Sequence, residues 1–212
     1  MNMFFSGIKQ IKSKEELTGY IGDPSPLVKA KPIDHLDSHC RTFLAHSPFA
    51  VLSTSDENGR CDASPRGDHP GFVYILDEHH LIIPERPGNK RMDTLKNLLE
   101  NNRIGLLFLI PGFGETLRIN GKGVVIKDEE ILAPLSVRGK APSLGIGVEV
   151  EECFIHCAKA MKRSGIWDQE RWPDTGAMPT AARMLSDHAA LKGQDENALT
   201  KRLEKGYREK LY

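Results

Sequence analysis

Residues 49–65 read FAVLSTSDENGRCDASP, and this stretch decides the class of fold. Phe49–Thr54 is an apolar run typical of a buried strand, and Arg60–Pro65 is a second extended segment. Asp56–Gly59 lies between them and is a strong signal for a hairpin turn, because its Asn-Gly pair tolerates the left-handed backbone that such turns need. The stretch predicts two adjacent antiparallel strands.

Similar segments continue along the chain. Further strands are predicted at Gly71–Leu76, Leu81–Pro84, Arg103–Ile110 and Thr116–Lys127, with another short strand near Val148–Ile155. The hairpin spacing of these segments predicts a β-barrel. Apolar residues at helical spacing predict one helix from Asp34, its expected N-cap, to Pro48, and a second between Arg91 and Asn102 that covers one end of the barrel.

The chain divides into three predicted parts. Residues 1–33 are a polar arm with a capping-box pattern from Ser13 to Glu16, residues 34–167 form the barrel domain, and residues 168–212 form a helical extension. The last helix of this extension is expected to begin at Asp195. Its apolar stripe, which we expect to pack on a partner surface, consists of Leu199, Leu203, Tyr207 and Leu211.

Composition excludes several classes of protein. The chain has 29 basic and 29 acidic residues among 212, so no overall positive field attracts nucleic acid or an anionic membrane. The longest strongly apolar stretch, Ile104–Pro111, is far too short to span a bilayer. The four cysteines contain no Cys-x-x-Cys pair and are expected to be reduced thiols. We expect a cytoplasmic protein that binds any anionic ligand through a local cluster of cations.

Residues 84–91, PERPGNKR, supply such a cluster at the junction of a strand and a helix. Lys90 and Arg91 are expected in the first turn of the helix, where each cation is disfavoured by about 0.3–1 kcal/mol. A bound phosphate makes the electrostatic energy of these cations favourable, because backbone N–H groups from Asn89 onward and both side chains can point at one dianion. The alternative is a solvated basic turn.

Two other polar segments also lie at strand ends. Residues 63–68, ASPRGD, place a cation beside Gly67, whose missing side chain allows a ligand to approach the backbone. Residues 115–121, ETLRING, place Thr116, Arg118 and Asn120 on one face of a strand. Each could be an ordinary exposed strand face, but three such segments at strand ends of one barrel favour a shared anion-binding cleft.

Residues 34–167 resemble the flavin-nucleotide-binding split-barrel proteins related to pyridoxamine 5'-phosphate oxidase. The resemblance is carried by four motifs: CDASPRGD at 61–68, IPERPGNKR at 83–91, GLLFLIPG at 105–112 and ETLRING at 115–121. It implies a mainly β fold with flanking helices, namely a six-stranded split β-barrel that forms a homodimer. The resemblance also implies that FMN binds in a cleft between the two subunits.

The resemblance assigns candidate roles to particular residues. It implies a cofactor site made of Ser64, Arg66, Gly67, Ile83, Pro84, Arg86, Asn89, Lys90, Arg91, Thr116 and Arg118. Lys90 and Arg91 match the basic pair that grips the phosphate, and Ser64 and Arg66 match a strand that lines the ring and ribityl chain. Thr116 and Arg118 stand where the partner subunit contributes polar groups.

The same resemblance implies a flavin-dependent oxidoreductase that acts on a small-molecule redox substrate, with NAD(P)H as a candidate electron donor. Residues 206–212, GYREKLY, lack the Arg-x-His clamp of the oxidases, so vitamin B6 is not the expected substrate. Candidate catalytic residues are His156, Arg163 and Trp167, which could instead belong to a helix packed on the barrel. The alternatives are a flavin carrier or sensor without turnover and a deazaflavin- or haem-binding relative.

No metal site is expected. His35 and His39 lie near Cys40, and His156 lies near Cys153 and Cys157, but neither group has the four ligands at recognised spacing that zinc requires.

Overall fold

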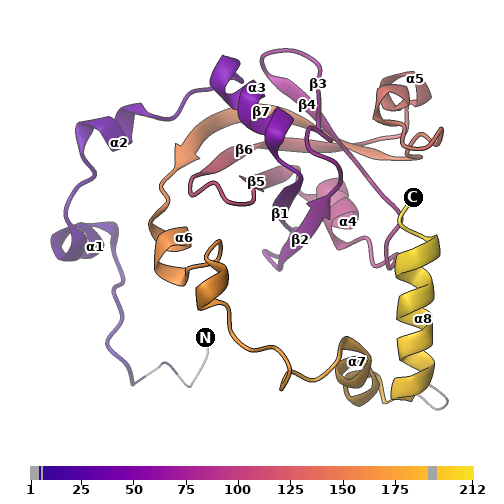
Figure 1. Cartoon of the computed structure of the whole chain (residues 1–212). Helices are drawn as coiled ribbons and strands as arrows, with labels where there is room; N and C mark the ends of the chain where they lie inside the picture. Colours follow the sequence, from indigo (N-terminus) through magenta and orange to yellow (C-terminus); the bar gives the residue numbers. More distant parts are fainter. Residues whose placement is uncertain (1–4, 6, 191–194) are drawn as a thin grey trace. The chain divides into compact units, whose positions relative to one another are not determined.

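The computed structural model describes residue 5, residues 7–190 and residues 195–212 (Figure 1). The chain divides into two compact units after Pro32. The first unit contains helices α1 (Lys14–Ile21) and α2 (Pro26–Ala30), neither of which has a buried residue. As predicted, Ser13 caps α1: its Oγ accepts a hydrogen bond of 3.1 Å from the backbone N–H of Glu16.

The second unit contains all of the strands. They are β1 (Phe49–Ser55), β2 (Cys61–Gly67), β3 (Tyr74–Ile75), β4 (His80–Pro84), β5 (Arg103–Leu109), β6 (Thr116–Ile126) and β7 (Gly145–His156). The α-helices of this unit are α3 (Ser38–His46), α4 (Asp93–Glu100), α5 (Glu129–Leu132), α6 (Lys159–Ser164), α7 (Ala181–Ala189) and α8 (Glu196–Glu209). Two 3-10 helices, η2 (Ala133–Leu135) and η3 (Gln169–Arg171), complete it.

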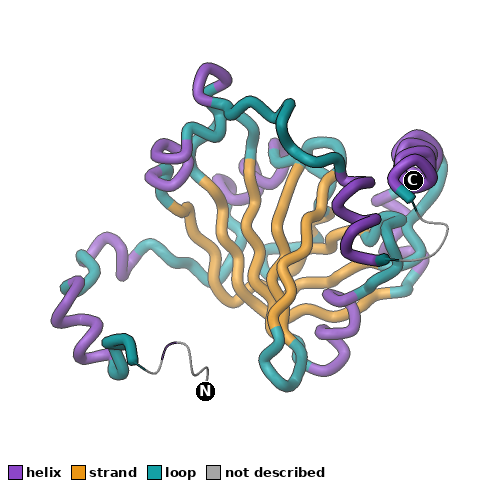
Figure 2. The backbone as a smooth tube through the Cα atoms, turned by 90° about the horizontal axis from the view of Figure 1, so that it is seen from below, coloured by secondary structure: helices purple, strands orange, loops and turns teal. Residues whose placement is uncertain are grey.

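The strands form one antiparallel sheet in the order β2-β1-β5-β6-β7-β4-β3 (Figure 2). The described chain therefore has seven strands, one for each segment predicted above and one more than the six-stranded barrel that the resemblance implies, although β3 is only two residues long. The predicted hairpin from β1 to β2 is present, with Phe49 opposite Gly67 and Ser55 opposite Cys61. Gly59 in its turn has φ of 78°, which explains why glycine is suited to that position.

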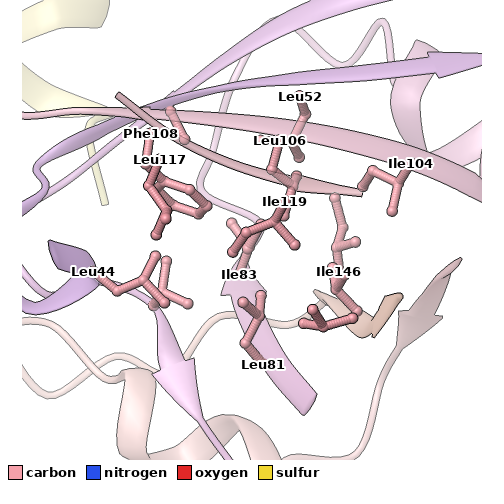
Figure 3. Packing of buried hydrophobic residues seen from close by; sticks show 14 of the residues in the cluster. Leu44, Leu52, Leu81, Ile83, Ile104, Leu106, Phe108, Leu117, Ile119 and Ile146 are labelled. Carbon is pink, nitrogen blue, oxygen red and sulfur yellow. The ribbon is translucent and has the colours of Figure 1, made fainter. Parts of the chain in front are cut away.

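The sheet curls around a single large core. Leu52 on β1 belongs to the same buried cluster as Leu81 and Ile83 on β4, although three strands separate β1 from β4 in the sheet. In a flat sheet these strands would be about 19 Å apart, four times the usual spacing. Figure 3 shows Leu52 and Leu106 facing Leu81 and Ile83 across the core. This curvature is consistent with the predicted split barrel.

Two helices close the core. Phe43 and Leu44 of α3 and Leu95 and Leu98 of α4 are buried in the same cluster. This burial agrees with the apolar spacing in the sequence and confirms that both segments are helical.

The start of α3 differs from the prediction. Its N-cap is Asp37, whose Oδ1 accepts a hydrogen bond of 2.8 Å from the N–H of Cys40, and not Asp34. Asp34 instead lies 2.9 Å from Nδ1 of its neighbour His35. Two aspartates three residues apart both resemble caps in the sequence, and only the tertiary position of the first turn distinguishes them.

The C-terminal helices are present, but the expected apolar stripe is only partly covered. Asp195 caps α8 as predicted, through a 2.8 Å bond from the N–H of Ala198. Leu199 is buried, as is Ala182 of α7. Tyr207 and Leu211 remain 64% and 58% exposed, so the second half of the stripe does not pack within the described chain.

Among the described residues, no helix has both the length and the apolar character needed to cross a membrane.

Candidate ligand-binding site

Loop 85–92, which joins β4 to α4, is tied to β2 at both of its ends. At its start, Glu85 Oε2 lies 3.0 Å from Nη2 of Arg66. Just beyond its end, Thr94 Oγ1 donates a 2.7 Å hydrogen bond to Asp62 Oδ2. Asp62 and Arg66 share one face of β2, with Ser64 between them. The loop therefore runs along β2 beside Ser64 and Arg66, which brings together two of the segments singled out in the sequence.

Arg66 has an unused hydrogen-bond donor. Its Nη1 donates to Ser64 Oγ at 2.6 Å and to the Pro65 carbonyl at 3.0 Å. Its Nε is buried and has no hydrogen-bond partner among the described residues, and Glu85 Oε2 accepts no well-directed bond either. A buried N–H without an acceptor is unfavourable, which makes Arg66 Nε a position where a ligand oxygen or a water fits.

Arg86 is committed to other parts of the protein. Its Nε lies 2.7 Å from Asp68 Oδ2, and its Nη2 donates a 2.9 Å bond to the carbonyl of Leu135. Burial by itself raises the pKa of Asp68, but hydrogen bonds from the His69 N–H, Tyr212 and Arg86, with the charge of Arg86, outweigh it and hold the pKa below its ordinary value. The side chain of Asp68 is only 2% exposed, so Arg86 neutralises a buried charge.

Lys90 and Arg91 precede helix α4, and the prediction that they occupy its first turn is wrong. Lys90 and the N-cap residue Met92 have φ of 62° and 61°, so the chain reaches Asp93 through two left-handed residues before the helix begins. Asn89 stabilises this turn, because its Oδ1 accepts a 2.9 Å bond from the N–H of Arg91.

The two cations of this turn differ from Arg66 and Arg86 in their exposure. Within the described chain Lys90 has no hydrogen bond or ion pair, and it is exposed. Arg91 is 77% exposed and pairs with the carboxylate of Asp93, a hydrogen bond that raises the pKa of Arg91. Met92 offers no side-chain cap, so the first N–H groups of α4 are available as well.

These features together favour an anion at the start of α4. The charges of Arg66, Arg86 and Arg91 face Glu85, Asp68 and Asp93, so the unbalanced positive charge available to a ligand comes from Lys90 and from the uncapped helix terminus, with the exposed guanidinium of Arg91 beside them. Arg66, with its unused donor, lies on the same face of β2 as Asp62, to which the start of α4 is tied.

A second group of predicted residues gathers on the other face of the sheet. Thr116, Arg118 and His156 line a hollow of about 370 Å³ together with Val51, Ser53, Gly105, Leu106, Leu107, Asn120, Cys157, Ala160 and Met161. The guanidinium of Arg118 lies 5.5 Å from the centre of the Phe154 ring. We call this hollow the outer groove.

The outer groove and loop 85–92 are on opposite faces of the sheet. Ser64 pairs with the buried Leu52, whereas Val51 and Ser53, which alternate with Leu52, line the outer groove. In addition, β1 and β5 separate β2 from β6, which carries Arg118. The structure therefore does not bring the two groups of predicted cofactor residues together within one chain.

Of the three candidate catalytic residues, only His156 lines the groove. His156 ends β7, and α6 begins three residues later, at Lys159. Trp167 Nε1 donates a 3.0 Å bond to the carbonyl of Phe113, and Arg163 is exposed.

Three further residues predicted to bind the cofactor, Ile83, Pro84 and Gly67, have structural roles within the barrel. Ile83 is fully buried in the core, and Pro84 ends β4. A Cβ at Gly67 would meet the carbonyl oxygen of Pro48 at 3.4 Å, so the absence of a side chain there suits the protein's own packing.

Sequence reasoning missed several residues of this region. A further hollow of about 530 Å³ adjoins the outer groove and shares Ser53, Gly105 and Asn120 with it. The ion pair of Asp68 with Arg86 and the link from Asp62 to Thr94 join residues 18 and 32 positions apart, and no local pattern indicates either pair. Tyr212 is even more distant from Asp68.

A curled, mainly antiparallel sheet with flanking helices is consistent with a split-barrel protein. Residues 36–157 match the family model described as pyridoxamine 5'-phosphate oxidase, and the chain belongs to this family. No match was found among curated proteins.

Several solved structures are similar to the chain. HupZ from Group A Streptococcus is 17% identical with a TM-score of 0.47, over 56% of this chain and 92% of that chain. A putative pyridoxamine 5'-phosphate oxidase from Lactobacillus delbrueckii is 19% identical with a TM-score of 0.46, over 58% and 98%. An FMN-binding protein from Syntrophomonas wolfei is 13% identical with a TM-score of 0.43, over 54% and 82%.

Proposed function

We propose that the protein binds FMN, with the phosphate at the turn Asn89–Asp93 and the ring system against β2. The observation that carries this proposal is the pair of exposed cations, Lys90 and Arg91, placed beside an uncapped helix terminus on a loop that is tied at both ends to β2. The membership of the chain in the pyridoxamine 5'-phosphate oxidase family supports it. A flavin phosphate also carries the negative charge that complements this basic turn.

The residues present fit such a cofactor. A phosphate accepts charge-assisted bonds from Lys90, Arg91 and the first N–H groups of α4, and a polar atom of the ring or ribityl chain satisfies the unused Nε of Arg66. Arg86 uses its Nε on Asp68 and its Nη2 on the carbonyl of Leu135, and we assign it to holding the loop in place.

We also propose a homodimer in which the outer groove of one subunit faces the flavin bound to its partner. Thr116, Arg118 and His156 then reach a flavin that they cannot contact on their own chain, because they lie on the opposite face of the sheet. Light scattering after size exclusion tests this proposal, and a monomer that binds FMN fully would contradict it.

The proposed activity is that of a flavin-dependent oxidoreductase. The flavin, when bound, supplies the capacity to accept and deliver hydride or single electrons. The chain supplies the binding of the phosphate, the orientation of the ring against β2, and a proton donor or acceptor at His156 in the outer groove.

Mass spectrometry of the small molecule released from denatured protein tests the cofactor directly. We expect FMN, and we expect the flavin-free protein to bind added FMN with one site per chain. A different released cofactor together with no FMN binding would contradict the proposal. Anaerobic mixing with NADH or NADPH then separates an enzyme, whose flavin absorbance bleaches, from a carrier or sensor, whose absorbance does not change.

A further inference from the structure

The ring of Tyr212 is held between two guanidinium groups. The Cζ atoms of Arg86 and Arg138 lie 5.6 Å and 5.3 Å from the centre of the Tyr212 ring. The phenol hydroxyl donates a 2.8 Å hydrogen bond to Asp68 Oδ1, while Arg86 binds the other carboxylate oxygen. Cation–π contact and a hydrogen bond to a buried carboxylate therefore act on the same side chain.

The residues that receive this ring are fixed by contacts of their own. Arg86 is held by Asp68 and by the carbonyl of Leu135. Arg138 lies in a tight turn closed by two 3.0 Å bonds between Val137 and Lys140, and its φ of 52° is a left-handed conformation that is unusual for arginine. The turn thereby fixes the backbone from which Arg138 reaches the ring.

Tyr212 follows α8 by three residues, and its contacts differ from those of the helix. The helix packs against α7, where Thr180 Oγ1 donates a 2.8 Å bond to Glu196, and Tyr207 on its surface is 64% exposed. Figure 1 shows that the end of α8 lies beside the chain that leaves β4. The polar contacts that the structure gives between residues 195–212 and the barrel are those of Tyr212.

We propose that Asp68, Arg86 and Arg138 form a docking site for a phenol ring, which Tyr212 occupies, and that this contact fixes the α7–α8 tail (residues 181–190 and 195–212) beside loop 85–92. The site selects an aromatic ring through its two guanidinium groups and a hydroxyl through Asp68. The tail thus restrains the loop through this contact, and Tyr212 is a positioning residue.

Docking has a consequence for the ligand, which rests on the proposed function. Arg86 is the second residue of the loop that carries Lys90 and Arg91, and Tyr212 restricts the motion of its guanidinium. A loop that is ordered before binding loses less conformational entropy when a phosphate arrives, so docking of the tail strengthens FMN binding. By linkage, FMN also strengthens docking of the tail.

Hydrogen exchange in the flavin-free, full-length protein tests the docking. We expect the amides of α8 to exchange about fivefold faster in Tyr212→Ala and in Arg138→Ala, as expected for loss of cation–π contacts. Tyr212→Phe keeps the ring but not the hydroxyl and should lie between wild type and Tyr212→Ala. Tyr207→Ala is the matched control, since it removes an exposed tyrosine from the same helix. Wild-type exchange in both Tyr212→Ala and Arg138→Ala, or equal acceleration in Tyr207→Ala, would overturn the proposal.

The FMN dissociation constant of the same variants tests the coupling. We expect Tyr212→Ala to weaken FMN binding about fivefold and Tyr207→Ala to leave it unchanged. If Tyr212→Ala releases α8 but binds FMN as tightly as wild type, the coupling is wrong. If the wild-type protein binds no FMN, the proposed function fails, and the exchange measurement still decides whether Tyr212 docks.

Discussion

Loop 85–92 and its surroundings contain two kinds of basic residue. Arg66 and Arg86 are largely buried, and each faces a carboxylate. Lys90 and Arg91 are exposed at the turn before α4, where Arg91 pairs with Asp93 at the surface. Removing one partner of a buried ion pair destabilises the protein, because the other charge is then buried without compensation. An exposed cation contributes little to the stability of the fold and remains available to a ligand. The comparison therefore separates the residues that stabilise the loop from the residues that we propose bind its ligand.

The largest effect is expected from Arg86→Ala, which leaves the carboxylate of Asp68 buried without its cation. We expect the free energy of unfolding to fall by about 3 kcal/mol, measured by urea denaturation. Lys90→Ala, in the same loop, should leave the denaturation midpoint unchanged. Equal stability losses in the two variants would remove the distinction between them.

The exposed pair should show the opposite behaviour. We expect Lys90→Ala with Arg91→Ala to weaken FMN binding roughly a hundredfold, because two charge-assisted contacts to the phosphate are lost, and to leave the melting temperature unchanged. Lys201→Ala with Arg202→Ala is the matched control, since it removes an exposed Lys-Arg pair from α8. Isothermal titration measures the FMN affinity of both double variants. Equal affinities in the two would contradict the role of the turn.

The tie between α4 and β2 should have a smaller effect. Thr94→Val removes the buried hydroxyl that donates to Asp62 and should lower the free energy of unfolding by about 1.5 kcal/mol. Because the loop is then tied to β2 only at Glu85, FMN affinity should also fall. An unchanged FMN affinity in a destabilised Thr94→Val would show that the loop does not need its second tie.

The smallest expected effect is the dependence of the free energy of unfolding on acidic pH. The folded protein lowers the pKa of Asp68, so ionised Asp68 stabilises the fold above its ordinary pKa, and this contribution is lost as the pH falls through the folded-state value. Stability should therefore drop below about pH 4, and the drop should be shallower in Asp68→Asn. If the free energy of unfolding falls with pH equally in wild type and Asp68→Asn, the charge of Asp68 does not contribute to stability through Arg86.

The sequence predicted the parts of this region that depend on local patterns. The hairpin at Asp56–Gly59 was correct because its turn is specified by adjacent residues, and the cap at Asp195 was correct as well. The cap predicted at Asp34 was wrong because Asp37, three residues later, is an equally good candidate. The start of α4 was wrong because the left-handed conformations of Lys90 and Met92 carry no sequence signal: neither is glycine or asparagine.

The long-range pairs could not be predicted in the same way. Asp68 finds Arg86 and Tyr212 only after the sheet has curled and the tail has returned to the barrel. The alternation of side chains also places Ser64 and Arg118 on opposite faces of the sheet, and the family resemblance had assigned Arg118 to the partner subunit. In the homodimer proposed above, the two residues face one flavin from different subunits.

Comparing FMN with riboflavin, which lacks the phosphate, tests the central claim most directly. Both dissociation constants are measured for the wild type and for Lys90→Ala with Arg91→Ala. The wild type should prefer FMN, and the double variant should lose most of that preference while its riboflavin affinity stays the same. An FMN preference of equal size in both proteins would contradict the assignment of the phosphate to this turn.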